Sequence, residues 1–303
     1  MTPFEVTILG SNSAVPTPSR HPTSQLLNIN HHYYLIDCGE GTQIQMRKYG
    51  IKFQRIEHIF ISHLHGDHYF GLIGLLNTMH LLGREKPLTI HATRMLREII
   101  NIQLSVVNTK LKFDIHYNFL EDNSEKVILK DANVEVTATP VNHRIACFGF
   151  VFEEVERSLN LKKEALQELK LGVEEIKLLK SGKSIERAGE TILPEDVAET
   201  PSPLRKYAFI TDTKPDESYF KAISNSDLLY HESTFAGDNE QRAEDTFHTT
   251  NVQAAEIAIK TNCKKLLLGH FSTRYTKLEP IKEEARTVFP NTELAIEGST
   301  FSI

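Results

Sequence analysis

Four side chains able to bind a metal ion lie within six residues of this chain. They are found in the segment SHLHGDH, directly after the apolar run HIFIS. Side chains alternate along a strand with period two, so we expect His63 and His65 on one side. The turn that Gly66 allows would bring Asp67 and His68 to a second centre. Imidazole and carboxylate groups without thiolate suit zinc, or less selectively manganese or iron, so the pattern favours an open hydrolytic metal site over a surface loop rich in histidine.

Three further polar residues follow apolar runs later in the chain. His143 comes after VTATPVN, Asp212 after YAFIT and His270 after KKLLLG. The carboxyl ends of strands are where α/β proteins gather functional groups, so these residues could complete a pair of metal sites. Taken singly, Asp212 could be a turn residue and His143 a hydrogen-bonded histidine.

The elements that must position these residues alternate between strand and helix patterns. Runs of β-branched and aromatic residues between turn formers predict strands over 4–9, 25–30, 33–37 and 58–62. Helical spacing of apolar residues predicts helices over 42–48, 70–82 and 252–260. The segments KFDIHYNFL, KVILKD, NVEVTATPV and FGFVF predict neighbouring antiparallel strands. Two similar halves indicate an α/β (α+β) fold with two sheets face to face and helices outside.

The segment from about 153 to 200 departs from this scheme. It loses β character, and its alternating Leu, Lys and Glu residues could form a short two-helix arm. Its distal half carries the basic residues Lys177, Lys180, Lys183 and Arg187. Such a stretch is either a solvated insertion or an appendage that grips a partner.

The composition is that of a folded globular protein. Of 303 residues, 40% are hydrophobic and 24% charged, values that argue against disordered, collagenous and coiled-coil chains. No apolar run approaches the roughly 20 residues of a membrane span, and the first residues lack a signal-peptide pattern, so we expect a cytoplasmic protein with no membrane partner. Three cysteines without pair spacing agree with a reducing compartment. The net charge of −6 requires any RNA-binding charge to be local.

Taken together, the motifs resemble the ribonuclease Z family of the metallo-β-lactamase superfamily. The segments that carry the resemblance are GSNSAVPT, DCGEGTQ, SHLHGDH, NHRIACFGF, ITDT, HEST, HTTNVQAA and GHFSTRY. They extend over nearly the whole chain. The resemblance implies a single domain over 1–303 with the four-layer αββα metallo-β-lactamase sandwich, and a protruding flexible arm over 154–190.

The resemblance also implies two zinc ions per chain. It assigns His63, His65 and His143 to one ion, Asp67, His68 and His270 to the other, and Asp212 to both. Asp67 would orient or deprotonate the attacking water with its second oxygen. His248 of HTT would protonate the leaving 3′ oxygen, and Glu232 of HEST would hold its imidazole. Without the resemblance, His248 could also mark a helix start, because the Thr-Thr-Asn that follows it makes good caps.

The activity that the resemblance implies is hydrolysis of RNA. A homodimeric endoribonuclease would remove the 3′ trailer of precursor tRNA, leaving a 3′-hydroxyl on the tRNA and a 5′-phosphate on the trailer. Arg274 could clamp a phosphate and Ser272 add a hydroxyl contact, while the arm would hold the tRNA elbow. The alternative is a dinuclear metal phosphodiesterase acting on a small phosphodiester or another ester.

Two segments depart from the family pattern. The loop Pro16–His21 matches Pro-x-Lys-x-Arg-Asn at Pro16 and Arg20 but lacks the Lys and the Asn. In the family this loop tunes cleavage relative to an encoded CCA end. The arm has Gly172–Lys177 where relatives carry a Gly-Pro turn. The residues assigned to catalysis show no departure.

Overall fold

The computed structural model describes residues 2–106, 108–121, 123–155, 159–187, 189–199 and 203–303. The chain divides into two compact units, and each is described by itself. The larger unit comprises Met1–Lys130, Val134–Glu153 and Arg205–Ile303, and the smaller unit comprises Asp131–Asn133 and Glu154–Leu204. No helix among the described residues is long and apolar enough to cross a membrane.

The first sheet of the larger unit has seven strands in the order β16-β1-β2-β3-β4-β5-β6. Their bounds are β1 Phe4–Gly10, β2 Ser24–Ile29, β3 His32–Ile36, β4 Ile56–Phe60, β5 Leu88–Ala92, β6 Ile115–Phe119 and β16 Thr300–Ser302. β1, β2 and β3 pair antiparallel, and β3 to β6 pair parallel. Asn30 and His31 join β2 to β3 with φ of 52° and 70°, the conformation that a tight hairpin turn requires. The four strands predicted in this region are confirmed to within two residues.

The second sheet also has seven strands, in the order β15-β14-β13-β12-β9-β8-β7. Their bounds are β7 Lys126–Lys130, β8 Val134–Pro140, β9 Phe148–Glu154, β12 Lys206–Ile210, β13 Leu228–Glu232, β14 Leu266–Gly269 and β15 Thr292–Leu294. β12 to β15 pair parallel, and β9 pairs antiparallel with β12. This arrangement places the carboxyl ends of β12, β13 and β14 at one edge of the sheet.

The prediction that the segment from 112 to 152 forms neighbouring antiparallel strands is wrong for its first strand. β6 belongs to the first sheet and runs parallel to β5, whereas β7, β8 and β9 belong to the second sheet. A helix, α4 (Met95–Val106), connects β5 to β6. Such a crossover returns the chain in the same direction, so the two strands it joins are parallel.

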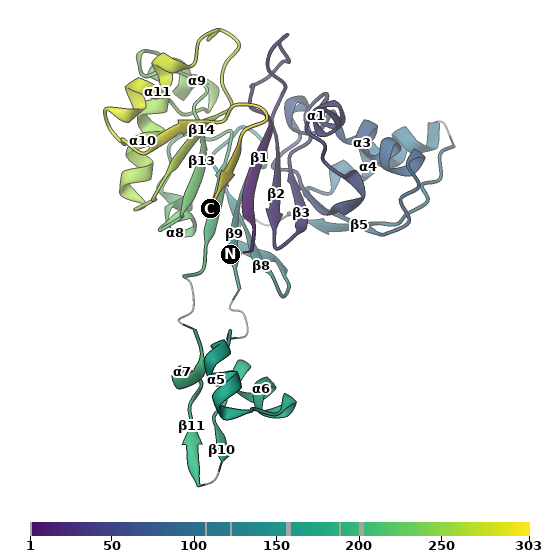
Figure 1. The fold of residues 1–303 in the computed structure, drawn as a ribbon. Helices are drawn as coiled ribbons and strands as arrows, with labels where there is room; N and C mark the ends of the chain where they lie inside the picture. Colours follow the sequence, from purple (N-terminus) through teal and green to yellow (C-terminus); the bar gives the residue numbers. More distant parts are fainter. Residues whose placement is uncertain (1, 107, 122, 156–158, 188, 200–202) are drawn as a thin grey trace. The chain divides into compact units, whose positions relative to one another are not determined.

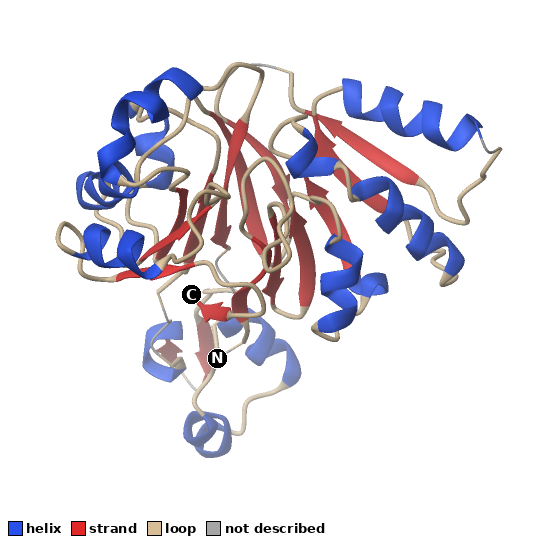
Figure 2. Ribbon diagram, turned by 90° about the horizontal axis from the view of Figure 1, so that it is seen from above, coloured by secondary structure: helices blue, strands red, loops and turns tan. Residues whose placement is uncertain are grey.

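Helices cover the outer face of each sheet (Figures 1 and 2). Buried apolar side chains of both sheets form one cluster between them. The first sheet packs against α1 Thr42–Lys48, α3 Leu72–Leu81 and α4, and the second against α8 Phe220–Ile223, α10 Asn251–Lys260 and α11 Glu279–Arg286. The remaining helices of this unit are α2 Gly66–Tyr69 and α9 Glu240–Thr246, and its 3-10 turns are η1 Phe53–Arg55, η2 Glu217–Tyr219 and η3 Gly237–Asn239. The layers are therefore α, β, β and α, as the resemblance implied.

The helix predicted over 70–82 begins two residues later because of a close backbone contact. The Gly71 N–H donates to the carbonyl oxygen of Cys38, and a Cβ on Gly71 would lie 2.0 Å from the carbonyl oxygen of Gly39. Only glycine permits this approach. The contact fixes α2 and α3 against the turn that follows β3.

The smaller unit has its own core and its own secondary structure. Its elements are α5 Lys163–Leu169, α6 Val173–Lys180, β10 Ile185–Arg187, β11 Glu190–Ile192 and α7 Pro194–Val197. Leu161, Leu179, Ile185, Val197 and Ala198 form its buried cluster. The expected loss of β character is wrong here, because β10 and β11 pair in an antiparallel hairpin. The predicted arm, 154–190, lies within this unit, and its residues 156–158 and 188 lie outside the described residues.

Candidate metal centre

The predicted ligands all follow the carboxyl ends of strands. His63 and His65 come after β4, Asp67 and His68 lie in α2, and His143, Asp212 and His270 come after β8, β12 and β14. Asp212 and His270 have φ of 43° and 57°, and Asp37, directly after β3, has φ of 54°. A positive φ is costly for residues other than glycine, and strained backbone of this kind gathers at functional sites. Three strained strand ends therefore mark this edge of the two sheets.

One group of ligand atoms joins three imidazoles to one carboxylate. His63 Nε2 and His65 Nδ1 are 2.9 Å apart, and His143 Nε2 lies 3.2 Å from the same His65 atom. Asp212 Oδ2 lies 3.6 Å from His63 Nε2 and 3.9 Å from His143 Nε2. Tetrahedral zinc with bonds of about 2.0–2.1 Å would place its ligand atoms about 3.3 Å apart. These four residues therefore match the spacing of a metal site, and His65 leaves it open to solvent.

A second group lies on the other side of Asp212. Asp67 Oδ2 lies 3.4 Å from His68 Nε2 and 3.3 Å from His270 Nε2. Asp212 Oδ1 is 3.2 Å from each of these two nitrogens. Because Oδ1 faces one group and Oδ2 the other, Asp212 is placed to serve both.

The charges of the buried ligand groups favour a bound cation. His68 Nε2 is buried without a hydrogen-bond partner, although two carboxylate oxygens lie within 3.4 Å of it. Burial lowers the pKa of His68, but the carboxylates of Asp212, Asp67 and Asp37 outweigh it and raise this pKa well above the ordinary value. Burial alone would raise the pKa of Asp212, yet the neighbouring imidazoles hold this pKa well below its usual range. A metal ion would supply the same positive charge and satisfy the open nitrogens, so the residues fit one.

A layer of hydrogen bonds behind the ligands fixes their orientation. Asp37 Oδ2 lies 2.7 Å from His68 Nδ1, and the same carboxylate accepts the N–H and the Oγ–H of Ser62 at 2.8 and 2.9 Å. Thr234 Oγ1 lies 2.8 Å from His270 Nδ1. In each pair Nδ1 is engaged, so Nε2 presents its lone pair to the metal centre.

Sequence reasoning gave no role to Asp37 and Thr234. Asp37 follows an apolar strand as Asp212 does, and this position was the signal that could have singled it out. Thr234 stands in HEST beside Glu232, but its bond to His270 spans 36 residues and depends on how β13 and β14 pair.

The partly exposed His248 and the buried Glu232 form an ion pair beside the candidate metal centre. His248 Nδ1 lies 2.9 Å from Glu232 Oε1, and that carboxylate also accepts the Thr213 N–H at 2.8 Å and the Thr234 hydroxyl at 2.5 Å. Burial lowers the pKa of His248, but the Glu232 carboxylate more than offsets this effect, and the resulting pKa is about 9. The His248 ring centroid is 5.5 Å from that of His270. The Glu232 carboxylate therefore favours the protonated form of this imidazole.

The role of His248 is distinct from capping the following helix. α10 begins at Asn251, and its capping residue is Thr250, whose Oγ1 accepts the Gln253 N–H at 3.2 Å. Gln253 Oε1 in turn accepts the Thr250 N–H at 3.0 Å. His248 precedes this cap, and its Nδ1 is directed to Glu232 instead.

Comparisons with known proteins identify the family of this chain. Residues 4–160 match the family model of Anti-Pycsar protein Apyc1. A ribonuclease Z of Cytophaga hutchinsonii is 45% identical over 302 residues, which cover 99% of this chain and 96% of that protein. A ribonuclease Z of Parabacteroides distasonis is 38% identical over 304 residues and is covered completely, as is this chain. The chain belongs to the ribonuclease Z family.

Solved structures agree with membership of the ribonuclease Z family. The short form of human tRNase Z is 27% identical with a TM-score of 0.72, and the match covers 99% of both chains. The metallo-β-lactamase fold protein YhfI of Bacillus subtilis is 18% identical with a TM-score of 0.70, over 99% of this chain and all of the other. The second likeness shows the fold, which is the metallo-β-lactamase sandwich expected of a ribonuclease Z.

The residues predicted to contact RNA fall in two places. Arg274 is exposed, donates to Asn239 Oδ1 at 3.1 Å, and stacks its guanidinium 5.0 Å from the Phe235 ring, which itself lies 6.1 Å from the His248 ring. Ser272 is bonded through its N–H to the carbonyl of Thr234. Both therefore lie near the metal centre.

The basic residues of the smaller unit differ in their availability. Lys180 and Lys183 are exposed, and Lys177 is exposed in an ion pair of 2.7 Å with Glu174. Arg187 is half-buried, and its guanidinium donates to the carbonyl oxygen of Leu169. Arg187 therefore stabilises the unit itself.

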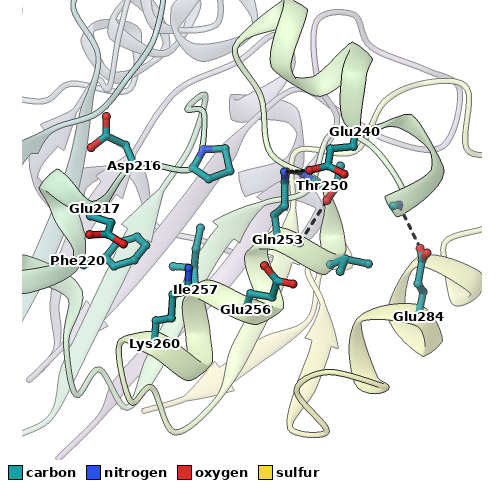
Figure 3. Close-up of a pocket in the computed structure, with 13 residues that line it drawn as sticks. Asp216, Glu217, Phe220, Glu240, Thr250, Gln253, Glu256, Ile257, Lys260 and Glu284 are labelled. Atoms are coloured by element: carbon teal, nitrogen blue, oxygen red, sulfur yellow. Dashed lines mark hydrogen bonds between the residues drawn. The ribbon is translucent and has the colours of Figure 1, made fainter.

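A separate hollow of about 440 Å³ lies along α10 and contains none of the predicted ligands (Figure 3). Asp216, Glu217, Glu240, Glu256 and Glu284 line it, with Lys260 as the cationic side chain among the lining residues. This concentration of carboxylates repels phosphate. An RNA strand would therefore reach the metal centre by another path.

Proposed function

We propose that this ribonuclease Z is a zinc-dependent endoribonuclease that removes the 3′ trailer of precursor tRNA. The products would be a tRNA with a 3′-hydroxyl and a trailer with a 5′-phosphate. The observation that carries the proposal is the His248–Glu232 pair beside two groups of metal ligands that share Asp212. Relatives named ribonuclease Z, aligned over nearly the full length of this chain, support the same conclusion.

Two zinc ions per chain are part of this proposal. The residues that would hold them are His63, His65 and His143 for one ion, Asp67, His68 and His270 for the other, and Asp212 for both. A donor set of imidazoles and carboxylates without thiolate supports zinc. Bound there, the pair would lower the pKa of a water and offset the charge that develops on the phosphate.

His248 supplies the proton that the leaving group needs. Its pKa of about 9 keeps the imidazole protonated at neutral pH. Because Nδ1 is held by Glu232, the proton available to substrate is the one on Nε2. A ribose alkoxide is a poor leaving group, and protonation of the 3′ oxygen in the transition state removes that barrier.

The decisive experiment is to incubate purified protein and zinc with one end-labelled precursor tRNA and map the cut. We expect a single cleavage at the 3′ end of the tRNA body, with a 3′-hydroxyl on the tRNA. Metal-loaded protein that leaves the precursor intact, or cuts it within the tRNA body, would contradict the proposal.

The second candidate is a phosphodiesterase acting on a small substrate. The match to the Apyc1 family model favours it, because that match covers the metal-binding segment 63–68 and His143. The match ends at residue 160, however, before Asp212, Glu232, His248 and His270. Comparing kcat/KM for a precursor tRNA and a small chromogenic phosphodiester separates the two candidates.

We also propose that the arm over 154–190 binds the tRNA elbow. Exposed Lys177, Lys180 and Lys183 support this role, because RNA backbone is recognised mainly through its phosphates. Replacing the arm by a short Gly/Ser linker should weaken precursor binding and flatten its salt dependence while hydrolysis of a small phosphodiester continues. Unchanged tRNA affinity would exclude the arm as a binding element.

The proposed enzyme is a homodimer in the cytoplasm, where precursor tRNA is found. Ile44, Leu81 and Val106 on α1, α3 and α4 are 62%, 78% and 78% exposed, and we expect the dimer interface to cover these apolar side chains. Light scattering should give twice the chain mass for the native protein. Replacing the three residues by Ser should yield monomers, and a dimer that persists would place the interface elsewhere.

A further inference from the structure

The loop between β1 and β2 reaches the metal centre through its main chain. The Ala14 N–H donates to Asp67 Oδ2 at 2.8 Å. Ala14 has φ of 60°, which is unfavourable for a residue with a side chain. A strained residue that directs its N–H at a carboxylate of the site indicates that the loop is held in place for this contact.

This hydrogen bond distinguishes the two oxygens of Asp67. Oδ2 carries the Ala14 N–H and also lies 3.4 and 3.3 Å from the Nε2 atoms of His68 and His270. No hydrogen bond from the described residues reaches Oδ1. Asp67 therefore has one oxygen fixed toward the ligand nitrogens and one oxygen free.

Arg20 ties the loop to the segment that follows His270. Its Nε donates to Asn12 Oδ1 at 2.8 Å, its Nη1 to the carbonyl of Tyr275 at 2.8 Å, and its Nη2 to the carbonyl of Ser272 at 3.4 Å. All three nitrogens of the guanidinium are thus engaged, which lysine cannot reproduce.

Asn12, which accepts the hydrogen bond from Arg20 Nε, also makes hydrogen bonds within the loop. Asn12 is fully buried, and its Nδ2 donates to the carbonyl of Val15 at 2.6 Å. The main chain on either side of Asn12 pairs with Phe271. The Ser13 N–H donates to the carbonyl oxygen of Phe271, and the Phe271 N–H donates to the carbonyl oxygen of Ser11. Ala14 lies inside this closed turn, so its N–H is fixed relative to the residue next to His270.

We propose that Arg20 is a positioning residue for Asp67. It holds the loop so that the Ala14 N–H fixes Oδ2 toward His68 and His270, and Oδ1 is the oxygen that takes the proton of the attacking water. The assignment of the proton to Asp67 rests on the proposed function. The positioning itself is independent of the substrate and is measurable without RNA.

The test replaces Arg20 by Met, which keeps an unbranched apolar side chain and removes every donor. Hydrogen bonds behind metal ligands typically contribute 10- to 100-fold to affinity or rate. We expect Arg20→Met to bind zinc about tenfold more weakly at one of the two proposed sites. Chelator competition followed by metal analysis of RNA-free protein measures this affinity. We also expect the single-turnover rate on saturating precursor tRNA to fall by a similar factor, with KM within about twofold of the native value. Arg20→Lys should recover only part of both losses.

The matched control is Arg286→Met. Arg286 is another half-buried arginine whose Nε donates to a main-chain carbonyl, that of Thr292, and it takes no part in the site. We expect this variant to lower the melting temperature without changing zinc affinity or kcat. If it reproduces the losses of Arg20→Met, those losses reflect general destabilisation and the proposal fails.

A second variant acts on the hydrogen bond alone and does not depend on the folding of Arg20→Met. An ester in place of the amide at position 14, introduced with lactic acid during translation, replaces the N–H by oxygen. We expect it to weaken zinc binding at one site and to lower the single-turnover rate as Arg20→Met does, relative to protein made by the same route with alanine.

The outcomes separate the inference from the function on which it rests. Native zinc affinity in both the ester protein and Arg20→Met would overturn the positioning role, whatever the substrate. A raised KM with unchanged kcat would identify Arg20 as part of an RNA-binding loop and also overturn it. Weakened zinc binding in a protein that leaves precursor tRNA intact would support the positioning role while contradicting the proposed function.

Discussion

If His248 is the general acid, as proposed, Glu232 should set the pH range over which the enzyme is active. The pKa of His248 is about 9 with the carboxylate of Glu232 at 2.9 Å. An unperturbed histidine titrates at about 6.5, so its surroundings as a whole favour the imidazolium by roughly 3 kcal/mol, with Glu232 as the largest favourable contributor. Glu232→Gln removes the negative charge and keeps an oxygen that can accept from Nδ1. We expect the pKa of His248 to fall toward 6.5 in this variant.

The loss of protonated imidazole gives the size of the effect. At pH 8, about nine tenths of His248 is protonated with a pKa near 9, and about one thirtieth with a pKa near 6.5. The single-turnover cleavage rate at pH 8 should therefore fall about 30-fold, and at pH 6 it should fall less than twofold. A pH series of single-turnover rates on precursor tRNA measures this directly.

Two controls accompany the pH series. NMR titration of the His248 ring should show its pKa falling in parallel with the rate, and metal analysis should show unchanged zinc content. If the alkaline limb stays near pH 9 in a fully metallated Glu232→Gln protein, the carboxylate does not set the protonation of the acid. The leaving group would then take its proton from another source.

Three other perturbations test the site and the core. His248→Ala should lower the single-turnover rate by roughly 10²- to 10⁴-fold with tRNA affinity and zinc content unchanged, and a near-native rate would exclude His248 as the acid. Asp37→Ala removes the acceptor for His68 Nδ1, so zinc affinity should fall about 10- to 100-fold by chelator competition, whereas unchanged affinity would make Asp37 purely structural. Burial and the neighbouring His58 lower the pKa of His91 to about 3, so the folded protein holds this ring neutral and loses stability as pH falls from 6.5 toward 3, at about 1.4 kcal/mol per pH unit. Urea unfolding between pH 7.5 and 5 should show that the free energy of unfolding falls less steeply with decreasing pH in His91→Gln than in the native protein. Identical slopes would show that His91 does not cause the loss of stability.

The ion pair and the positioning loop act on opposite ends of the same reaction. In the mechanism we propose, Glu232 holds a proton on His248 for the leaving group, and the Ala14 N–H leaves one oxygen of Asp67 free for the attacking water. Both devices reach the site from outside the segment SHLHGDH. Their separation lets proton removal and proton donation be altered independently by mutation.

The sequence by itself determined the features that depend on short-range order. His63, His65, Asp67 and His68 are close in space because a strand end and one turn of helix bring neighbours in sequence together. The strand patterns before Asp212 and His270 likewise reflect local alternation, and both residues lie where those patterns place them. Local periodicity is a property of the chain, so it could be predicted without the fold.

Only the tertiary structure decided which distant groups meet. The sequence of a short apolar strand does not indicate which sheet the strand joins. The placement of β6 beside β5 follows from the crossover through α4. The β10–β11 hairpin arises from packing within the small unit, where Ile185 is buried in a charge-rich segment. The bonds from Ala14 to Asp67 and from Arg20 to Tyr275 cross 53 and 255 residues, because pairing of loops at strand ends brings them together. Hydrogen bonds at such separations depend on how the sheets pack. That packing is the physical reason why local sequence could indicate the candidate metal ligands but not the groups that hold them in place.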